Sequence, residues 1–142
     1  MGHKLIQLGI TLFLLGLLTG FAAVMLANPR MGLSSHLEGV MNGMFLVLLG
    51  LIWERLKLSN GALRFTFWLA VYGTFVNWFT ILLAAIWGAG GSSMPIVAQS
   101  FLGSSMQETI IKIGLFSLSF AMIIVCVLVL WGLRSYVAKA EA

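Results

Sequence analysis

Four long apolar stretches, almost free of charge, constrain this chain more than any other feature of its sequence. A helix that crosses a bilayer needs about 20 apolar residues, and the sequence offers such stretches at 5–26, 36–53, 65–87 and 110–131. The apolar share is 61% and the charged share is 8%, whereas an ordinary soluble domain is about 25% charged. We therefore predict an all-α membrane protein, a four-transmembrane-helix bundle, with a single integral-membrane domain over residues 1–142.

Basic residues gather on one side of the predicted spans. The N-terminus, the 54–64 loop and the C-terminus share that side, and the other side holds only Arg30 and Lys112. Because Lys and Arg collect on the cytoplasmic side of membrane proteins, we expect both termini to be cytoplasmic. The basic residues on that side are Lys4, Arg55, Lys57, Arg64, Arg134 and Lys139.

The residue inventory excludes several classes of function. The net charge of +4 is spread over helix ends rather than run together, which favours lipid headgroups over nucleic acid as a partner. The lone Cys126 can form no disulfide within the chain, and no Cys pair or His-x-x-x-His spacing indicates zinc. The chain has no Asp and no phosphate-binding loop, so classical triad hydrolysis and kinase chemistry lack their residues.

Polar residues inside the predicted membrane region lie on the second and third spans. Ionisable and amide groups at such depth are costly, and they usually serve a function. The simplest inference is a site built from these two spans, although an interfacial His, a hydrated carboxylate and plain helix–helix hydrogen bonds would each explain part of the pattern. The candidates are His36, Glu38, Asn42, Tyr72 and Asn77.

His36 and Asn42 are expected to point in different directions. At 100° per residue, side chains six positions apart lie about 120° apart around a helix and about 9 Å apart along it. The pair would therefore serve one cavity from two directions, or two sites across a subunit contact. Glu38 and Asn42 are four residues apart and share a face.

Three segments resemble a known family. The run NPRMGLSSHLEGVMNGM at 28–44 is similar to the bacterial hydroxylaminobenzene mutases, and the likeness continues through YGTFVNW at 72–78 and WGAGG at 87–91. A more distant resemblance is to the membrane styrene oxide isomerases. Their pattern of His, five residues and Asn-Gly-Met is repeated by His36 and Asn42-Gly43-Met44.

The first resemblance implies an isomerase of nitroaromatic degradation in the bacterial inner membrane. Its reaction would convert hydroxylaminobenzene and related aryl hydroxylamines to 2-aminophenols by moving a hydroxyl group within one molecule. The second resemblance implies ferric haem b as a Lewis acid, a homotrimer with haem between subunits, and His36 as the iron ligand. Asn42 would then line the substrate pocket, and Glu38, Tyr72 and Asn77 would complete the catalytic candidates.

Two other classes of function remain open on the sequence alone. A haem-b membrane electron carrier would fit the composition, but carriers generally hold iron with two strong axial ligands, and His36 is the only transmembrane His on its side. A small-molecule transporter fits the composition equally well. Such a protein would usually keep a membrane-centred carboxylate, whereas Glu38 is predicted near the start of its span.

Overall fold

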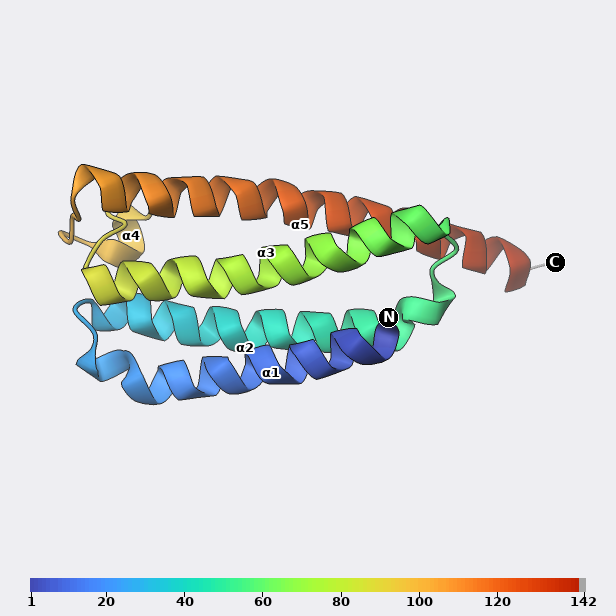
Figure 1. The fold of residues 1–142 in the computed structure, drawn as a ribbon, viewed down its shortest axis with the longest axis horizontal. Coiled ribbons are helices and arrows are strands. Elements are labelled where there is room, and N and C mark those ends of the chain that lie inside the picture. Colours follow the sequence, from blue (N-terminus) through green and yellow to red (C-terminus); the bar gives the residue numbers. More distant parts are fainter. Residues whose placement is uncertain (141–142) are drawn as a thin grey trace.

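The computed structural model describes residues 1–140, and side chains over 1–134. It confirms the predicted all-helical fold: within this range, four helices are long and apolar enough to cross a membrane (Figure 1). Lys139 lies outside the residues whose side chains are described. The long helices are α1 (Gly2–Ala22), α2 (Pro29–Ile52), α3 (Asn60–Trp87) and α5 (Ser105–Ala140), and the short ones are η1 (Ala23–Met25), η2 (Trp53–Arg55) and α4 (Pro95–Ala98).

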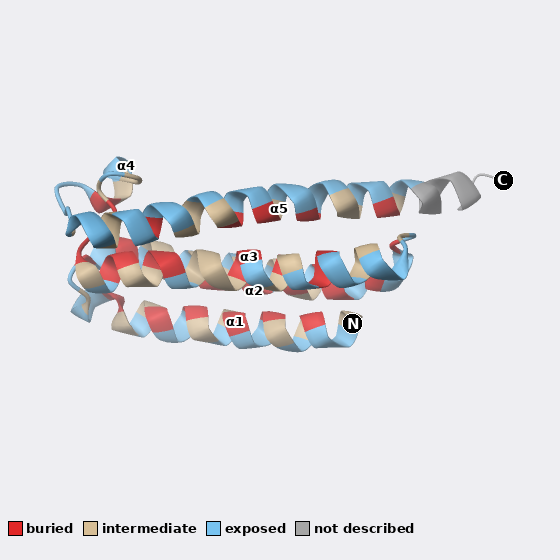
Figure 2. Cartoon of the chain, turned by 45° about the horizontal axis from the view of Figure 1, so that its top comes forward, coloured by how far each residue is buried: buried red, intermediate tan, exposed pale blue. Residues whose placement is uncertain are grey.

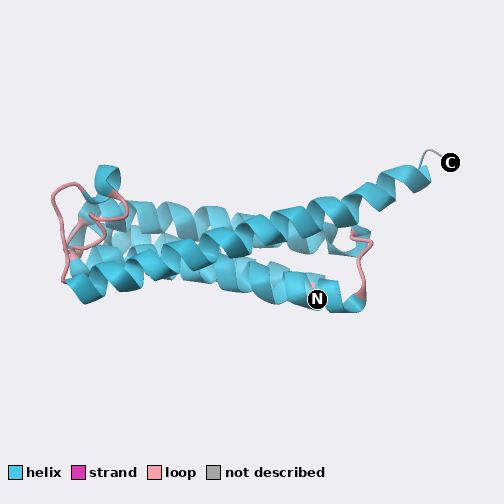
Figure 3. Cartoon of the chain, turned by 90° about the horizontal axis from the view of Figure 1, so that it is seen from above, coloured by secondary structure: helices cyan, strands magenta, loops and turns pink. Residues whose placement is uncertain are grey.

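The long helices form two pairs that are joined through the middle. α1 packs along α2 and α3 packs along α5, while the contact between α2 and α3 holds the pairs together (Figures 1 and 3). The N-terminus and the α2–α3 connection lie at one end of the bundle, and α4 lies at the other (Figure 1). The candidate residues of the second and third spans are therefore central to the bundle.

Small residues bring α1 and α2 into close contact. A Cβ added to Gly39 would lie 2.5 Å from the Cα of Gly16, and one added to Gly9 would lie 2.7 Å from the carbonyl oxygen of Gly43. Lipid tails are as apolar as leucine, so membrane helices associate through such close backbone packing rather than through the hydrophobic effect. Side chains at these four positions would force the two helices apart.

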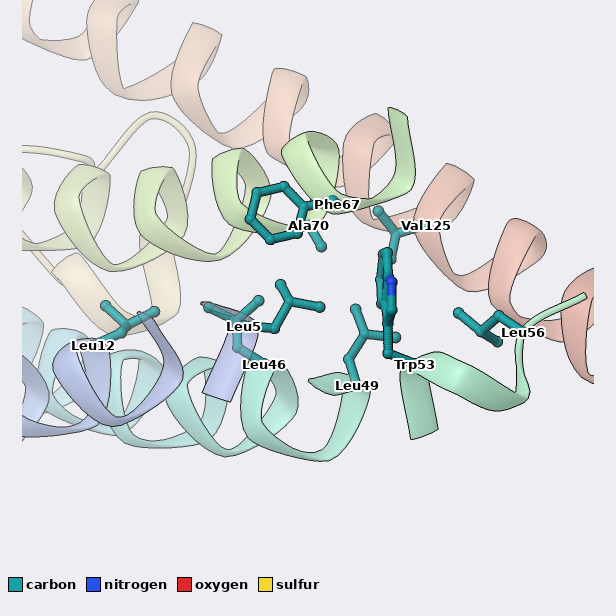
Figure 4. Close-up of a cluster of buried hydrophobic side chains, with 9 residues drawn as sticks. All are labelled: Leu5, Leu12, Leu46, Leu49, Trp53, Leu56, Phe67, Ala70 and Val125. Carbon is teal, nitrogen blue, oxygen red and sulfur yellow. The ribbon is translucent and has the colours of Figure 1, made fainter. Parts of the chain in front are cut away.

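Apolar side chains fill the space between the two pairs, toward the end that carries the N-terminus. Buried positions face the neighbouring helices, whereas the outward faces are exposed, as suits contact with lipid (Figure 2). The indole of Trp53 is 6% exposed and meets the ring of Phe67 edge-on at 6.2 Å between centroids. The cluster in Figure 4 consists of Leu5, Leu12, Leu46, Leu49, Trp53, Leu56, Phe67, Ala70 and Val125.

The second helix begins seven residues earlier than the expected start at 36. Asn28 caps it, because its Oδ1 accepts the backbone N–H groups of Arg30 at 3.1 Å and Met31 at 3.2 Å. Pro29 occupies the first helical position, where its missing N–H costs nothing. The expected boundary came from hydropathy alone and was wrong. As a result, His36 and Glu38 lie two to three turns inside α2 rather than at its start.

The long connection between α3 and α5 is also more ordered than a plain loop. It contains α4, and α5 begins at Ser105 rather than at the expected 110. The carboxylate of Glu108 accepts the backbone N–H groups of Gly90 at 2.7 Å and Gly103 at 2.9 Å. This side chain ties both ends of the connection to the first turn of α5.

Replacement of Asn28 by Ala should destabilise the bundle by roughly 1–3 kcal/mol, because a helix cap and a buried hydrogen bond to the α4 segment are both lost. Asn28 is 2% exposed, and its Nδ2 donates to the carbonyl of Ala98 at 3.2 Å. Thermal unfolding of the purified protein in detergent measures the effect. Asn60→Ala is the control, since this exposed residue starts α3 without a side-chain bond in the described structure. Equal losses in the two variants would contradict the capping role.

Candidate functional site

Three of the polar candidates meet between α2 and α3. The Oε2 of Glu38 accepts a hydrogen bond from the Nδ2 of Asn42 at 3.1 Å and another from the Nδ2 of Asn77 at 2.5 Å. All three side chains are half-buried. Glu38 and Asn42 share a face of α2 because they are one turn apart, and α3 brings Asn77 across from the other helix. Two amide groups, one from each helix, therefore fix the carboxyl group of Glu38 in place.

His36 points to the opposite neighbour, α1. Its Nδ1 lies 2.8 Å from the carbonyl oxygen of Gly16. A carbonyl oxygen can only accept, so Nδ1 carries a proton, and in the tautomer that this selects Nε2 keeps the lone pair. Histidines that ligate metals commonly donate their second ring N–H to a carbonyl in this way. The geometry thus presents Nε2 of His36 as a ligand for a metal.

The donor set suits a haem rather than a metal held by protein side chains alone. Among the described side chains, no three His, Cys, Asp or Glu residues are grouped so as to hold a metal ion. A haem iron carries its own equatorial nitrogen donors and needs only an axial ligand from the protein. The oriented imidazole of His36 meets that requirement.

Trp78 connects the three helices around His36. Its indole N–H donates to the hydroxyl of Thr19 on α1 at 3.1 Å, and its backbone carbonyl accepts from Ser35 on α2 at 3.1 Å. Sequence reasoning missed this set of contacts. A signal was present, since a Trp in the interior of a span carries an N–H that needs a partner.

Tyr72 lies on a different face of α3 from Asn77. Its hydroxyl donates to Ser117 of α5 at 2.9 Å, and its side chain is 44% exposed. Gly73 also faces α5, where an added Cβ would meet the sulfur of Met122 at 2.6 Å. The structure therefore brings Glu38, Asn42 and Asn77 together and leaves Tyr72 outside the group.

Within one chain, His36 and the Glu38 group lie on different sides of α2. The imidazole is bonded to α1, whereas the carboxylate is bonded to α3. The spacing of His36 and Asn42 predicts that their side chains point in different directions, and these contacts agree with that prediction. A ligand that touches both sets would therefore approach α2 from two sides.

Comparison with known proteins gives the family. A family model described as styrene oxide isomerase matches residues 1–134. Hydroxylaminobenzene mutase HabB of Ectopseudomonas oleovorans is 58% identical over 139 residues, which is 98% of this chain and 85% of HabB. Hydroxylaminobenzene mutase HabA of the same organism is 42% identical over 125 residues, or 88% of this chain and 93% of HabA. No solved structure is significantly similar.

Gly20→Ala should displace the imidazole of His36. The added Cβ would lie 2.7 Å from Nδ1, so the ring must move off the carbonyl of Gly16. We expect a lower midpoint of thermal unfolding and a changed pattern of imidazole ¹⁵N chemical shifts, which report the tautomer. The matched control is Gly61→Ala, because no atom lies within 4 Å of that Cβ. It should leave stability unchanged or raise it by about 0.5–1 kcal/mol. An unchanged His36 signal in Gly20→Ala would refute the contact.

Proposed function

This chain belongs to the styrene oxide isomerase family and is an isomerase, and we propose that it converts hydroxylaminobenzene and related aryl hydroxylamines to 2-aminophenols. The observation that carries this proposal is the 58% identity to HabB across nearly the whole chain. The arrangement of Glu38 between Asn42 and Asn77 supports it, because the reaction needs an oriented group that moves protons.

The proposed reaction is an isomerisation with no net transfer of electrons. The N–O bond breaks and a C–O bond forms at the ortho carbon. That carbon loses a proton and the nitrogen gains one, so no reductant or oxygen is consumed. In this proposal Glu38 takes the proton from the ring carbon and returns it to nitrogen. Asn42 and Asn77 hold the carboxylate in position, and Asn42 also contacts the substrate.

We propose that His36 would hold a ferric haem b through its Nε2. The hydrogen bond from Nδ1 to Gly16 supports this role, since it leaves Nε2 unprotonated and fixes the plane of the ring. When bound, the haem would supply a Lewis acid that favours departure of the hydroxylamine oxygen. The apolar residues around the site would keep water from adding to the ring in place of the transferred hydroxyl.

A homotrimer completes the proposed site. His36 faces α1 and Glu38 faces α3, so one copy would supply His36 and the neighbouring copy would supply Asn42 and Glu38. A single chain with four long helices offers little wall for both a haem and an aromatic substrate. The contact between copies provides the missing wall.

The assay uses membranes that contain the protein, an aryl hydroxylamine as substrate, and neither NAD(P)H nor oxygen. We expect 2-aminophenol to form at a steady rate, and the purified protein to show a Soret band. His36→Ala should lose the haem and the activity together. Glu38→Gln should keep the haem and lose roughly 10²- to 10⁴-fold in rate, the usual contribution of a positioned proton-transfer group.

His3→Ala is the control for the haem ligand, because His3 is exposed near the start of α1. It should retain both haem and activity. A strict requirement for an added reductant would argue against isomerisation. Full haem content and normal turnover in His36→Ala would remove the ligand assignment, and normal turnover in Glu38→Gln would remove the proton-transfer role.

We also propose that both termini face the cytoplasm, in the bacterial inner membrane. Lys4, Arg55, Lys57 and Arg64 belong to the end of the bundle that holds the N-terminus and the α2–α3 connection (Figure 1). A reporter enzyme that works only in the cytoplasm should therefore be active when fused at Ser59, and one that works only in the periplasm should be inactive there. Fusions at Ser92 should show the opposite behaviour, and a periplasmic signal at Ser59 would reverse the orientation.

A further inference from the structure

A hollow of about 390 Å³ lies at the bundle end that carries the α2–α3 connection, between that connection and α5. It is formed by different residues from those of the candidate site. Its lining residues are Lys57, Leu58, Ser59, Ala62, Leu128 and Trp131. Arg134 belongs to the same place, because its guanidinium carbon lies 4.1 Å from the centroid of the Trp131 ring.

The polar residues that line this hollow are Lys57 and Ser59, and Arg134 packs on Trp131 of its wall; we call these three residues the polar rim. Lys57 is exposed and makes no ion pair in the described part of the chain. The oxygen of Ser59 accepts the N–H of Ala62 at 3.3 Å, so its O–H remains available to donate. An ammonium, a guanidinium and a hydroxyl around one hollow suit an anion with several acceptor oxygens, such as a phosphate group.

The rim is held in place by the fold. The backbone N–H of Lys57 donates to the carbonyl of Gly132 at 3.1 Å, which fixes the α2–α3 connection against α5. Leu58 packs against the same glycine, because a Cβ added to Gly132 would lie 3.1 Å from the Cγ of Leu58. The face of Trp131 orients Arg134 through a cation–π contact. The α2–α3 connection thus brings Lys57 to the hollow, and α5 brings Arg134 to Trp131 of its wall.

The hollow also has an apolar wall, which we define as Leu58, Leu128 and Trp131. This wall favours a lipid over a free anion as the ligand. Leu128 lies one turn further into the bilayer than Trp131, which is 56% exposed. Inorganic phosphate would use the rim and leave the wall unused. A phospholipid would use both, and Trp with Lys or Arg is the usual combination at the level of the headgroups.

We propose that this hollow binds one anionic phospholipid, with its phosphate at the polar rim and an acyl chain along the apolar wall. The bound lipid bridges the α2–α3 connection and α5, and so it stabilises the packing of that connection against α5. This site is independent of the isomerisation and of the haem.

The experiment titrates phosphatidylglycerol into the purified full-length protein in a neutral detergent. Native mass spectrometry counts bound lipid, and thermal unfolding measures the stabilisation. We expect one tightly held lipid per chain and a raised unfolding midpoint. Lys57→Gln and Arg134→Gln should each weaken binding about five-fold, the factor that corresponds to about 1 kcal/mol per basic residue.

Lys4→Gln is the matched control, since it removes the same charge at the same end without lining the hollow. It should bind the lipid as the unmodified protein does. Equal weakening of lipid binding in Lys4→Gln and Lys57→Gln would indicate diffuse attraction of the lipid to basic residues rather than a defined site, and would overturn the proposal. An equal stabilisation by inorganic phosphate, or equal binding of zwitterionic phosphatidylcholine, would likewise overturn the proposal.

Discussion

The contact between α1 and α2 is the constraint on which the candidate site depends. Inside a bilayer, apolar side chains gain nothing by exchanging lipid for one another, so two helices associate closely only where their backbones can meet. The opposition of Gly16 and Gly39 provides that meeting point. It also brings the carbonyl oxygen of Gly16 within 2.8 Å of the Nδ1 of His36. His36 lies one turn before Gly39 on α2. The packing that holds the helices together thus also fixes the tautomer of the imidazole.

α2 carries different chemistry on each of its sides. Toward α1 it presents glycines and the imidazole of His36, and toward α3 it presents the carboxylate of Glu38 with Asn42. The hydrogen bonds of Trp78 to α1 and α2 keep α3 in register with both. A polar group in a membrane must find a partner inside the protein, and this arrangement gives each of these groups one.

Hydropathy and spacing predicted the four spans and the shared face of Glu38 and Asn42, because both depend only on neighbouring residues. The start of α2 was missed although Asn28-Pro29 is a recognisable cap and first-turn sequence, because hydropathy does not register a cap. The partner of Asn77 could not be predicted, since it depends on how α3 rotates against α2. Tyr72 shows the same limit: it is close to Asn77 in sequence, yet it bonds to α5.

The position of the carboxylate has a consequence for the proposed chemistry. The sequence contains no Asp, and in the described structure the acid between the helices is Glu38 of α2, with α3 contributing the amide of Asn77. Glu38 and Asn42 therefore lie one turn apart on α2, so a single helix carries both the proposed proton carrier and the proposed substrate contact. Loss of the amide of Asn77 would remove one of the two hydrogen bonds to the carboxylate and keep the one from Asn42. In the proposed reaction the second helix therefore supplies both the proton carrier and the substrate contact, and the third helix restrains the carboxylate.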